Sequence, residues 1–120
     1  EMRVQGWKAM EDFYKLGKAR SIGVSHFCKR HIQDLLDAGL TKPHVNQVEF
    51  HVGMGTAGPE ATDDRDFNDA EGILYQSFSP LCGPCGTKEL VTGEFVTKIG
   101  KKYGKTGAQV SLKWQVQQGI

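Results

Sequence analysis

The sequence has little of several features that mark specialised classes of protein. Its formal net charge is only +1, with neither a block of like charges nor a basic stripe, so composition gives no reason to expect nucleic acid or an anionic membrane as a partner. Apolar runs stay below the roughly 20 residues that cross a bilayer, and we expect no membrane insertion. No apolar core of a signal peptide follows the first residues and no targeting signal is visible, so we expect the interior of a longer chain.

Cysteine is scarce too. The three cysteines are an odd number without the spacing of a disulfide framework, which argues against a secreted scaffold and for a cytoplasmic or other reducing compartment. Two of them form Cys82-Gly-Pro-Cys85, the active-site tetrapeptide of thioredoxin-like proteins. Pro80 interrupts the approach to this motif and no proline follows it. A zinc half-site is disfavoured because Cys28 is the one other thiol, so we predict no metal ligand and keep an oxidation-sensitive pair as an alternative.

What the sequence does contain is three short runs of β-branched or aromatic residues with polar residues at their ends. They lie at residues 23–27, 45–51 and 77–81. Their spacing is close to the roughly 30 residues of a strand with its crossover helix, which predicts consecutive β/α units. In such units ligands bind at the carboxyl ends of the strands, where Ser25, Gln47 and Phe78 stand.

Hydrophobic spacing predicts the other elements of a chain long enough for one domain. Strands are expected at residues 19–24, 45–50 and 73–78. A helix is expected at residues 3–16, ended by Gly17, and a second around Ile32 and Leu35, ended by Gly39. A further helix is expected at residues 95–103. Residues 53–72, rich in glycine and aspartate, predict at most a short helix and the weakest part of the fold.

The C-terminal stretch gives two conflicting signals. Apolar residues alternate strictly between Ala108 and Val116, which by period alone indicates a strand. Thr106 and Gln109, however, have the spacing of a capping box, and the residues that follow are good helix formers. We predict a helix.

Several single residues have simple structural explanations. Trp7 and Trp114 suit packing positions on helices, and His31 and His44 are expected at the surface. Taken alone, Ser25 would suit the N-cap of the helix that follows it.

Six groups of residues, in this order, resemble those of the aldo-keto reductase family. They are residues 7–11, 17–18, 22–25, 45–47 with His51, 79–81, and 102–119. The resemblance fails only across residues 53–72. It implies an α/β fold, a partial (β/α)8 TIM barrel of three parallel strands with crossover helices. On this basis residues 1–120 form one partial domain, the C-terminal half of the barrel without its last strand.

The resemblance also implies an activity and a cofactor. Members of this family transfer a hydride from a nicotinamide dinucleotide, usually NADPH, to an aldehyde or ketone; we expect NADP, with NAD possible. By position, Ser25, His26 and Gln47 would hydrogen-bond the nicotinamide carboxamide, and Phe78 would stack on the nicotinamide ring. Ser79 and Leu81 would line the pyrophosphate. The family usually has Asn in place of His26 and Tyr in place of Phe78.

The family's catalytic tetrad of Asp, Tyr, Lys and His has no matching position in this chain. We therefore predict no catalytic residue here and expect that the 120 residues alone do not reduce carbonyls. The expected partners are a small carbonyl substrate and the rest of the chain's own barrel or a larger assembly. Two alternatives stay open: a non-catalytic aldo-keto-reductase-like subunit, and a thiol redox module built on Cys82 and Cys85.

Overall fold

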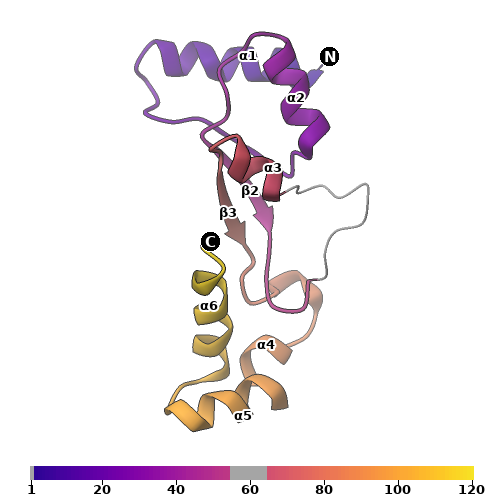
Figure 1. The fold of residues 1–120 in the computed structure, drawn as a ribbon, viewed down its shortest axis with the longest axis vertical. Coiled ribbons are helices and arrows are strands. Elements are labelled where there is room, and N and C mark those ends of the chain that lie inside the picture. The colour runs from indigo at the N-terminus through magenta and orange to yellow at the C-terminus, as the bar shows by residue number, and fades with distance from the viewer. Residues whose placement is uncertain (1, 55–64) are drawn as a thin grey trace. The chain divides into compact units, whose positions relative to one another are not determined.

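The computed structural model describes residues 2–54 and 65–120, whose elements are labelled in Figure 1. These residues divide into two compact units. Of the described residues, the first unit comprises 2–48 and 65–76, and the second comprises 49–54 and 77–120. Among the helices of the described residues, none has both the length and the apolar character needed to cross a bilayer.

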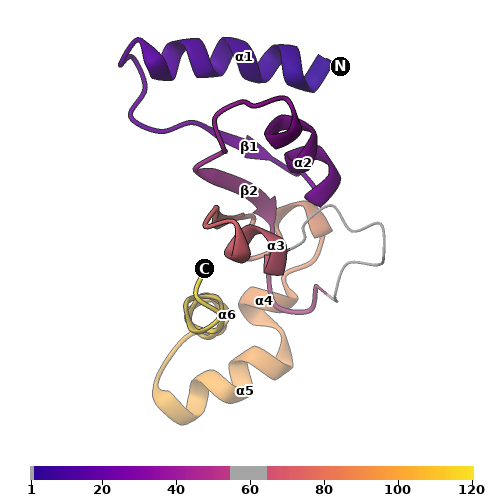
Figure 2. The same cartoon turned by 45° about the horizontal axis from the view of Figure 1, so that its top comes forward.

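The sheet has three parallel strands, as the sequence predicts. They are β1 (Gly23–Ser25), β2 (Val45–Glu49) and β3 (Leu74–Phe78), hydrogen-bonded in that order. β1 lies beside β2 (Figure 2) and pairs with it in parallel register, which sets Ser25 opposite Gln47. The arrows of β2 and β3 also point the same way in Figure 1. Consecutive β/α units explain this order, since each crossover returns the chain to the same end of the sheet.

β1 is shorter than the predicted strand over residues 19–24, because the ladder begins only at Gly23. One residue earlier, the N–H of Ile22 donates to Nδ1 of His44 at 3.2 Å rather than to a carbonyl of the sheet. Pro43, which comes next in that direction, has no N–H to extend the ladder. The longer predicted strand rests on apolar residues before Gly23 such as Ile22, which is buried but is not part of the ladder.

Three helices accompany the sheet in the first unit: α1 (Met2–Lys15), α2 (Lys29–Asp37) and α3 (Arg65–Ala70). α1 ends as predicted at Gly17, whose φ of 70° is left-handed. There the N–H of Lys18 donates to the carbonyl of Phe13 and the N–H of Gly17 to that of Tyr14, the pattern of a Schellman cap. α3 is the short helix expected within residues 53–72, and residues 55–64 lie outside the described part.

The core of the first unit gathers around Trp7, Ile22 and Leu35. Full burial of an aliphatic side chain such as Leu35 is worth about 1.5–3 kcal/mol, so these contacts hold α1 and α2 beside the sheet. Trp7 is a packing residue, as predicted, and its indole N–H also donates to the carbonyl of Thr41 at 2.7 Å.

The two histidines expected at the surface are half-buried instead, so that prediction is wrong. The ring of His44 packs on Tyr14 with centroids 5.0 Å apart. Nδ1 of His31 lies 3.3 Å from Sγ of Cys28, and burial lowers the pKa of His31. Imidazole rings have an apolar body, which lets them fill gaps between elements once a polar partner is available.

The second unit is helical after the end of β3. Its elements are the 3-10 turn η1 (Gly83–Cys85) and the helices α4 (Glu89–Thr92), α5 (Glu94–Tyr103) and α6 (Gly107–Gln117). α5 confirms the helix predicted at 95–103, with Val96 buried. η1 and α4 were not predicted, because neither is long enough to show a period in its sequence.

α6 confirms the helix and rules out the strand. The Thr106 side chain accepts from the N–H of Gln109, and the Gln109 side chain accepts from the N–H of Thr106. The buried residues of α6 are Gly107, Ser111 and Gln115, four apart and small or polar. The alternating apolar residues therefore do not mark the buried face, and Val116 is 63% exposed.

Gln115 joins three segments of the second unit through the hydrogen bonds of its side chain. Its side-chain N–H groups donate to the carbonyls of Phe50 and Pro80, and its oxygen accepts from the hydroxyl of Ser77 at 2.9 Å. Trp114, the neighbouring residue, stacks on Phe50 with ring centroids 5.5 Å apart. α6 therefore holds both the segment after β2 and the segment at the end of β3.

The carboxylate of Glu11 supports a first test of the fold. It accepts from the N–H and the hydroxyl of Thr41, at 2.7 and 2.6 Å, and pairs with Lys15. These groups, the Thr41 hydroxyl first, lower the pKa of Glu11 from 4.5 to about 2. Because the folded-state pKa is the lower one, the ionised carboxylate stabilises the fold fully above about pH 4.5 and progressively less as the pH falls toward 2.

We predict that Glu11→Gln lowers the free energy of unfolding at neutral pH, and that the gap to the wild type narrows as the pH falls from 4.5 toward 2. Urea denaturation across this pH range measures the gap. Asp12→Asn, which removes an exposed carboxylate from the same helix, is the control. A gap that does not change with pH would contradict the assigned role.

Candidate functional site

The end of β1 is held against β2 by two hydrogen bonds to one carbonyl. The Ser25 hydroxyl donates to the carbonyl of Gln47 at 2.9 Å, and the N–H of His26 donates to the same oxygen at 3.0 Å. The explanation of Ser25 as a helix N-cap is wrong, because Cys28 occupies the N-cap of α2. Ser25 instead stands at the strand end, as the ligand-site interpretation requires.

His26 has a backbone conformation that restricts which residues suit this position. Its φ is 54°, in the left-handed region that most side chains avoid and that Asn, Asp and His adopt several-fold more often than other non-glycine residues. Because both residue types tolerate this conformation, it explains why His can stand where the family that the sequence resembles usually has Asn. The side chain of His26 is exposed.

Asn46 fixes the loop that carries His26. It is fully buried on the helix-covered face of β2. Its amide N–H donates to the carbonyl of Phe27 at 2.7 Å and its oxygen accepts from the N–H of Phe27 at 3.3 Å. The same amide donates to the side chain of Asn68 on α3 at 3.2 Å. One signal of this role is visible in the sequence: an asparagine inside a strand, where that residue is normally depleted.

Gln47 points to the opposite face of β2, where it is exposed. Its amide donates to Oε1 of Gln76 on β3 at 2.9 Å. Ser25, Gln47 and Gln76 therefore line the uncovered face of the sheet in the first unit. An amide offers two N–H donors and an oxygen, so Ser25, Gln47 and Gln76 together form a polar edge suited to a ligand that also carries an amide. Gln76 was not predicted as a site residue.

The other predicted residues belong to the second unit. Phe78 is half-buried at the end of β3, and its carbonyl accepts from the N–H of Phe50. Ser79 and Cys82 both have left-handed backbones, with φ of 51° and 56°, and the N–H of Cys82 donates to the carbonyl of Ser79 at 2.8 Å. Non-glycine residues in this region store strain, which is common at ligand-binding loops.

A pocket of about 430 Å³ lies along this loop. It is lined by Leu81, Cys82, Gly83, Gly86, Thr87, Lys88 and Val91. Of the predicted pyrophosphate residues, Leu81 lines the pocket and Ser79 does not, although Ser79 shapes the backbone turn that leads into it. Convergence of Ser25, His26 and Gln47 with the residues of the second unit on one ligand stays a prediction.

Comparison with known proteins gives the class. The chain matches the model of the aldo/keto reductase family over residues 3–83. Glyoxal reductase of Bacillus subtilis (strain 168) is 40% identical over 116 residues, which make up 95% of this chain and 38% of that protein. The NADPH-dependent alpha-keto amide reductase of Saccharomyces cerevisiae is 36% identical, over 97% of this chain and 38% of its own length.

Solved structures agree. A variant of Gox0644 in complex with NADPH matches with a TM-score of 0.81 and 33% identity, over 98% of this chain and 40% of that one. The aldose reductase of Schistosoma japonicum matches with a TM-score of 0.78 and 29% identity, over 98% of this chain and 35% of that one. The chain therefore belongs to the aldo/keto reductase family, and its three parallel strands with their helices are an open part of a TIM barrel. It spans less than two fifths of the length of the curated relatives described above.

We predict that Asn46→Ala destabilises the protein through the loop after β1. The change removes the partner of the backbone N–H and carbonyl of Phe27, at a cost of about 1–3 kcal/mol for each group left unsatisfied. It also removes one hydrogen bond to the buried side chain of Asn68. Urea denaturation measures the loss. Gln33→Ala, which removes an exposed glutamine bonded to Asp37 on α2, should change stability much less. Equal effects of the two substitutions would show that Asn46 does not anchor the loop.

Proposed function

We propose that this chain is the nicotinamide-binding part of an NAD(P)H-dependent aldo-keto reductase that reduces aldehydes or ketones. The observation that carries the proposal is the polar edge of Ser25, Gln47 and Gln76 on the uncovered face of a parallel sheet. Family membership and the NADPH-dependent relatives favour NADP as the cofactor, with NAD as the second choice.

The proposed roles follow from hydrogen-bonding capacity and shape. The Gln47 amide and the Ser25 hydroxyl offer the donors and acceptors that a carboxamide requires. His26, at the same strand end, adds an imidazole to this group. These residues would fix the orientation of the nicotinamide, so that one face of its ring is directed at the substrate.

In the second unit, Phe78 would supply the aromatic face on which the nicotinamide stacks. Phenylalanine keeps the ring of the tyrosine usual in the family and loses its hydroxyl. Ser79 and Leu81 would border the pyrophosphate, and Leu81 already lines the 430 Å³ pocket. The bound cofactor supplies the hydride, and the protein contributes binding and orientation.

Proton donation to the carbonyl oxygen is assigned to residues outside this chain. No position here matches the family's tetrad, and general acid catalysis by a positioned side chain typically contributes about 10²- to 10⁴-fold. We therefore propose that turnover needs the rest of the barrel. A non-catalytic aldo-keto-reductase-like subunit would keep the cofactor-binding edge and lack turnover, so binding and turnover have to be measured separately.

We predict that Gln47→Ala in the full-length protein weakens NADPH binding by about 1–3 kcal/mol, or roughly 5- to 150-fold in Kd, through lost hydrogen bonds to the carboxamide. Isothermal titration calorimetry measures the Kd. Gln33→Ala, which removes an exposed glutamine from α2, is the matched control and should bind NADPH as the wild type does.

Two results would count against the proposal. An unchanged Kd in Gln47→Ala would remove Gln47 from the site. NADPH binding by the wild type without reduction of any aldehyde or ketone would favour the non-catalytic subunit.

A further inference from the structure

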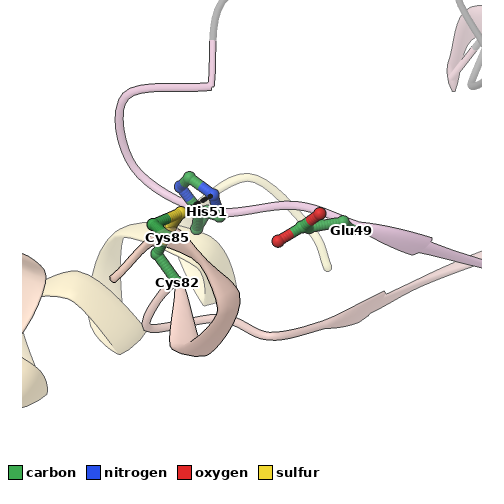
Figure 3. Close-up of side chains that lie close together, drawn as sticks. All are labelled: Glu49, His51, Cys82 and Cys85. Atoms are coloured by element: carbon green, nitrogen blue, oxygen red, sulfur yellow. Dashed lines mark hydrogen bonds between the residues drawn. A yellow bond between two sulfur atoms is a disulfide. The ribbon is translucent and has the colours of Figure 1, made fainter. Parts of the chain in front are cut away.

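Four side chains with metal-binding atoms meet beside η1 in the second unit. They are Glu49, His51, Cys82 and Cys85, and their ligand atoms all lie within 4.8 Å of one another (Figure 3). Glu49 is the last residue of β2, and His51 lies two residues after it. The cysteines come from the loop after β3. The proposed cofactor-binding role uses none of these four side chains.

His51 is oriented as a ligand. It is 9% exposed, and its Nδ1 lies 2.9 Å from the carbonyl oxygen of Val52. A carbonyl oxygen only accepts hydrogen bonds, so Nδ1 carries a proton, and in the neutral ring Nε2 then keeps its lone pair. Nε2 lies 3.7 Å from Sγ of Cys85. Histidines that bind metals usually donate their other ring N–H to a carbonyl or carboxylate in this way.

The cysteines are held on one short turn. Their Cα atoms are 5.3 Å apart, and in the structure the two sulfurs form a disulfide. The N–H of Cys85 donates to the carbonyl of Cys82 at 3.1 Å, a backbone hydrogen bond that closes the turn carrying both cysteines and does not involve their sulfurs. Cys82 is buried and Cys85 is exposed, so the pair is open to solvent from one side.

A disulfide alone does not account for the other two side chains. It needs no imidazole lone pair directed at it and no carboxylate nearby. Two sulfurs, one imidazole nitrogen and one carboxylate oxygen are instead a donor set for Zn²⁺, which binds such ligands tetrahedrally at about 2.0–2.3 Å. At those bond lengths two ligand atoms lie roughly 3.3–3.8 Å apart, a range that includes the 3.7 Å between Nε2 of His51 and Sγ of Cys85.

We propose that the reduced form of this chain binds Zn²⁺ through Cys82, Cys85, His51 and Glu49. Thiolate ligands select against Ca²⁺ and Mg²⁺, which prefer oxygen. Reduction of the disulfide takes two electrons and two protons from a dithiol reductant, which becomes a disulfide itself. Zinc binding then releases the two thiol protons to solvent. Disulfide and metal are mutually exclusive, because each uses both sulfurs.

The site lies where it can act on the neighbouring loop. Cys82 lines the 430 Å³ pocket together with Leu81 and Lys88, whereas Glu49 is the last residue of β2 and His51 lies two residues after it. A zinc ion would therefore tie the segment after β2 to the loop after β3 within the second unit. From the sequence alone zinc is disfavoured, because Cys28 is the one other thiol. In the structure Cys28 belongs to the first unit and is not part of this cluster, whose other two ligands are His51 and Glu49.

The test is metal binding by the full chain, reduced, freed of metal and kept without oxygen. Zn²⁺ is titrated against a chromophoric chelator, and Co²⁺ serves as a second probe because thiolate ligands give it a charge-transfer absorption. We expect one Zn²⁺ per chain and a thiolate-to-cobalt band. Cys85→Ser should abolish both. His51→Ala should weaken Zn²⁺ binding roughly a hundredfold or more, because loss of a direct ligand should cost at least as much as loss of an outer-shell partner.

Cys28→Ser is the matched control, since it removes a thiol and leaves the four proposed ligands in place. It should bind zinc as the wild type does. Circular dichroism of each variant shows that the fold is kept, and Cys85→Ser, at an exposed position, tests the site if His51→Ala fails to fold. Reduced wild type with all its thiols titratable and no bound zinc would overturn the proposal, as would zinc retained by Cys85→Ser. Disulfide exchange without any metal affinity would assign the pair to thiol redox chemistry instead.

Discussion

A parallel sheet is stable only when both of its faces are covered, and this requirement connects the fold to the proposed function. In the first unit the helices cover one face, where Asn46 and Val48 are fully buried. The other face carries Ser25, Gln47 and Gln76, all exposed, together with Leu74 at 58% exposure. In a closed barrel of this family the uncovered face is the interior, which explains why hydrogen-bonding side chains stand on strand positions that solvent reaches here.

Buried amides place the loops at the ends of the strands. Asn46 supplies both a donor and an acceptor to the backbone of Phe27 and so fixes the loop after β1. In the second unit, Gln115 bonds the carbonyls of Phe50 and Pro80 and so fixes the segments after β2 and β3. Because a buried amide left unpaired is costly, each of these residues restricts its loop to one arrangement. The positions of the proposed ligand-binding residues depend on these anchors.

Much of this arrangement could be predicted from the sequence, because its signals are local. The strand spacing predicted consecutive β/α units, in agreement with the observed sheet order β1-β2-β3. The Thr106 and Gln109 capping box correctly outweighed the alternating pattern that follows it. The partners of Asn46 and Gln115 could not be predicted, since they lie far away in the sequence. The same limit hid the metal-binding cluster: His51 and Cys85 are 34 residues apart, and no spacing rule joins an imidazole after one strand to a thiol after the next.

The central claim is that the carboxyl ends of these strands bind a nicotinamide cofactor. A crystal structure of the full-length protein with NADPH tests it most directly. The account predicts the carboxamide within hydrogen-bonding distance of Ser25 and Gln47, about 2.7–3.2 Å between heavy atoms, with the ring stacked on Phe78. A cofactor bound elsewhere, or a nicotinamide that touches neither Gln47 nor Phe78, would contradict the account.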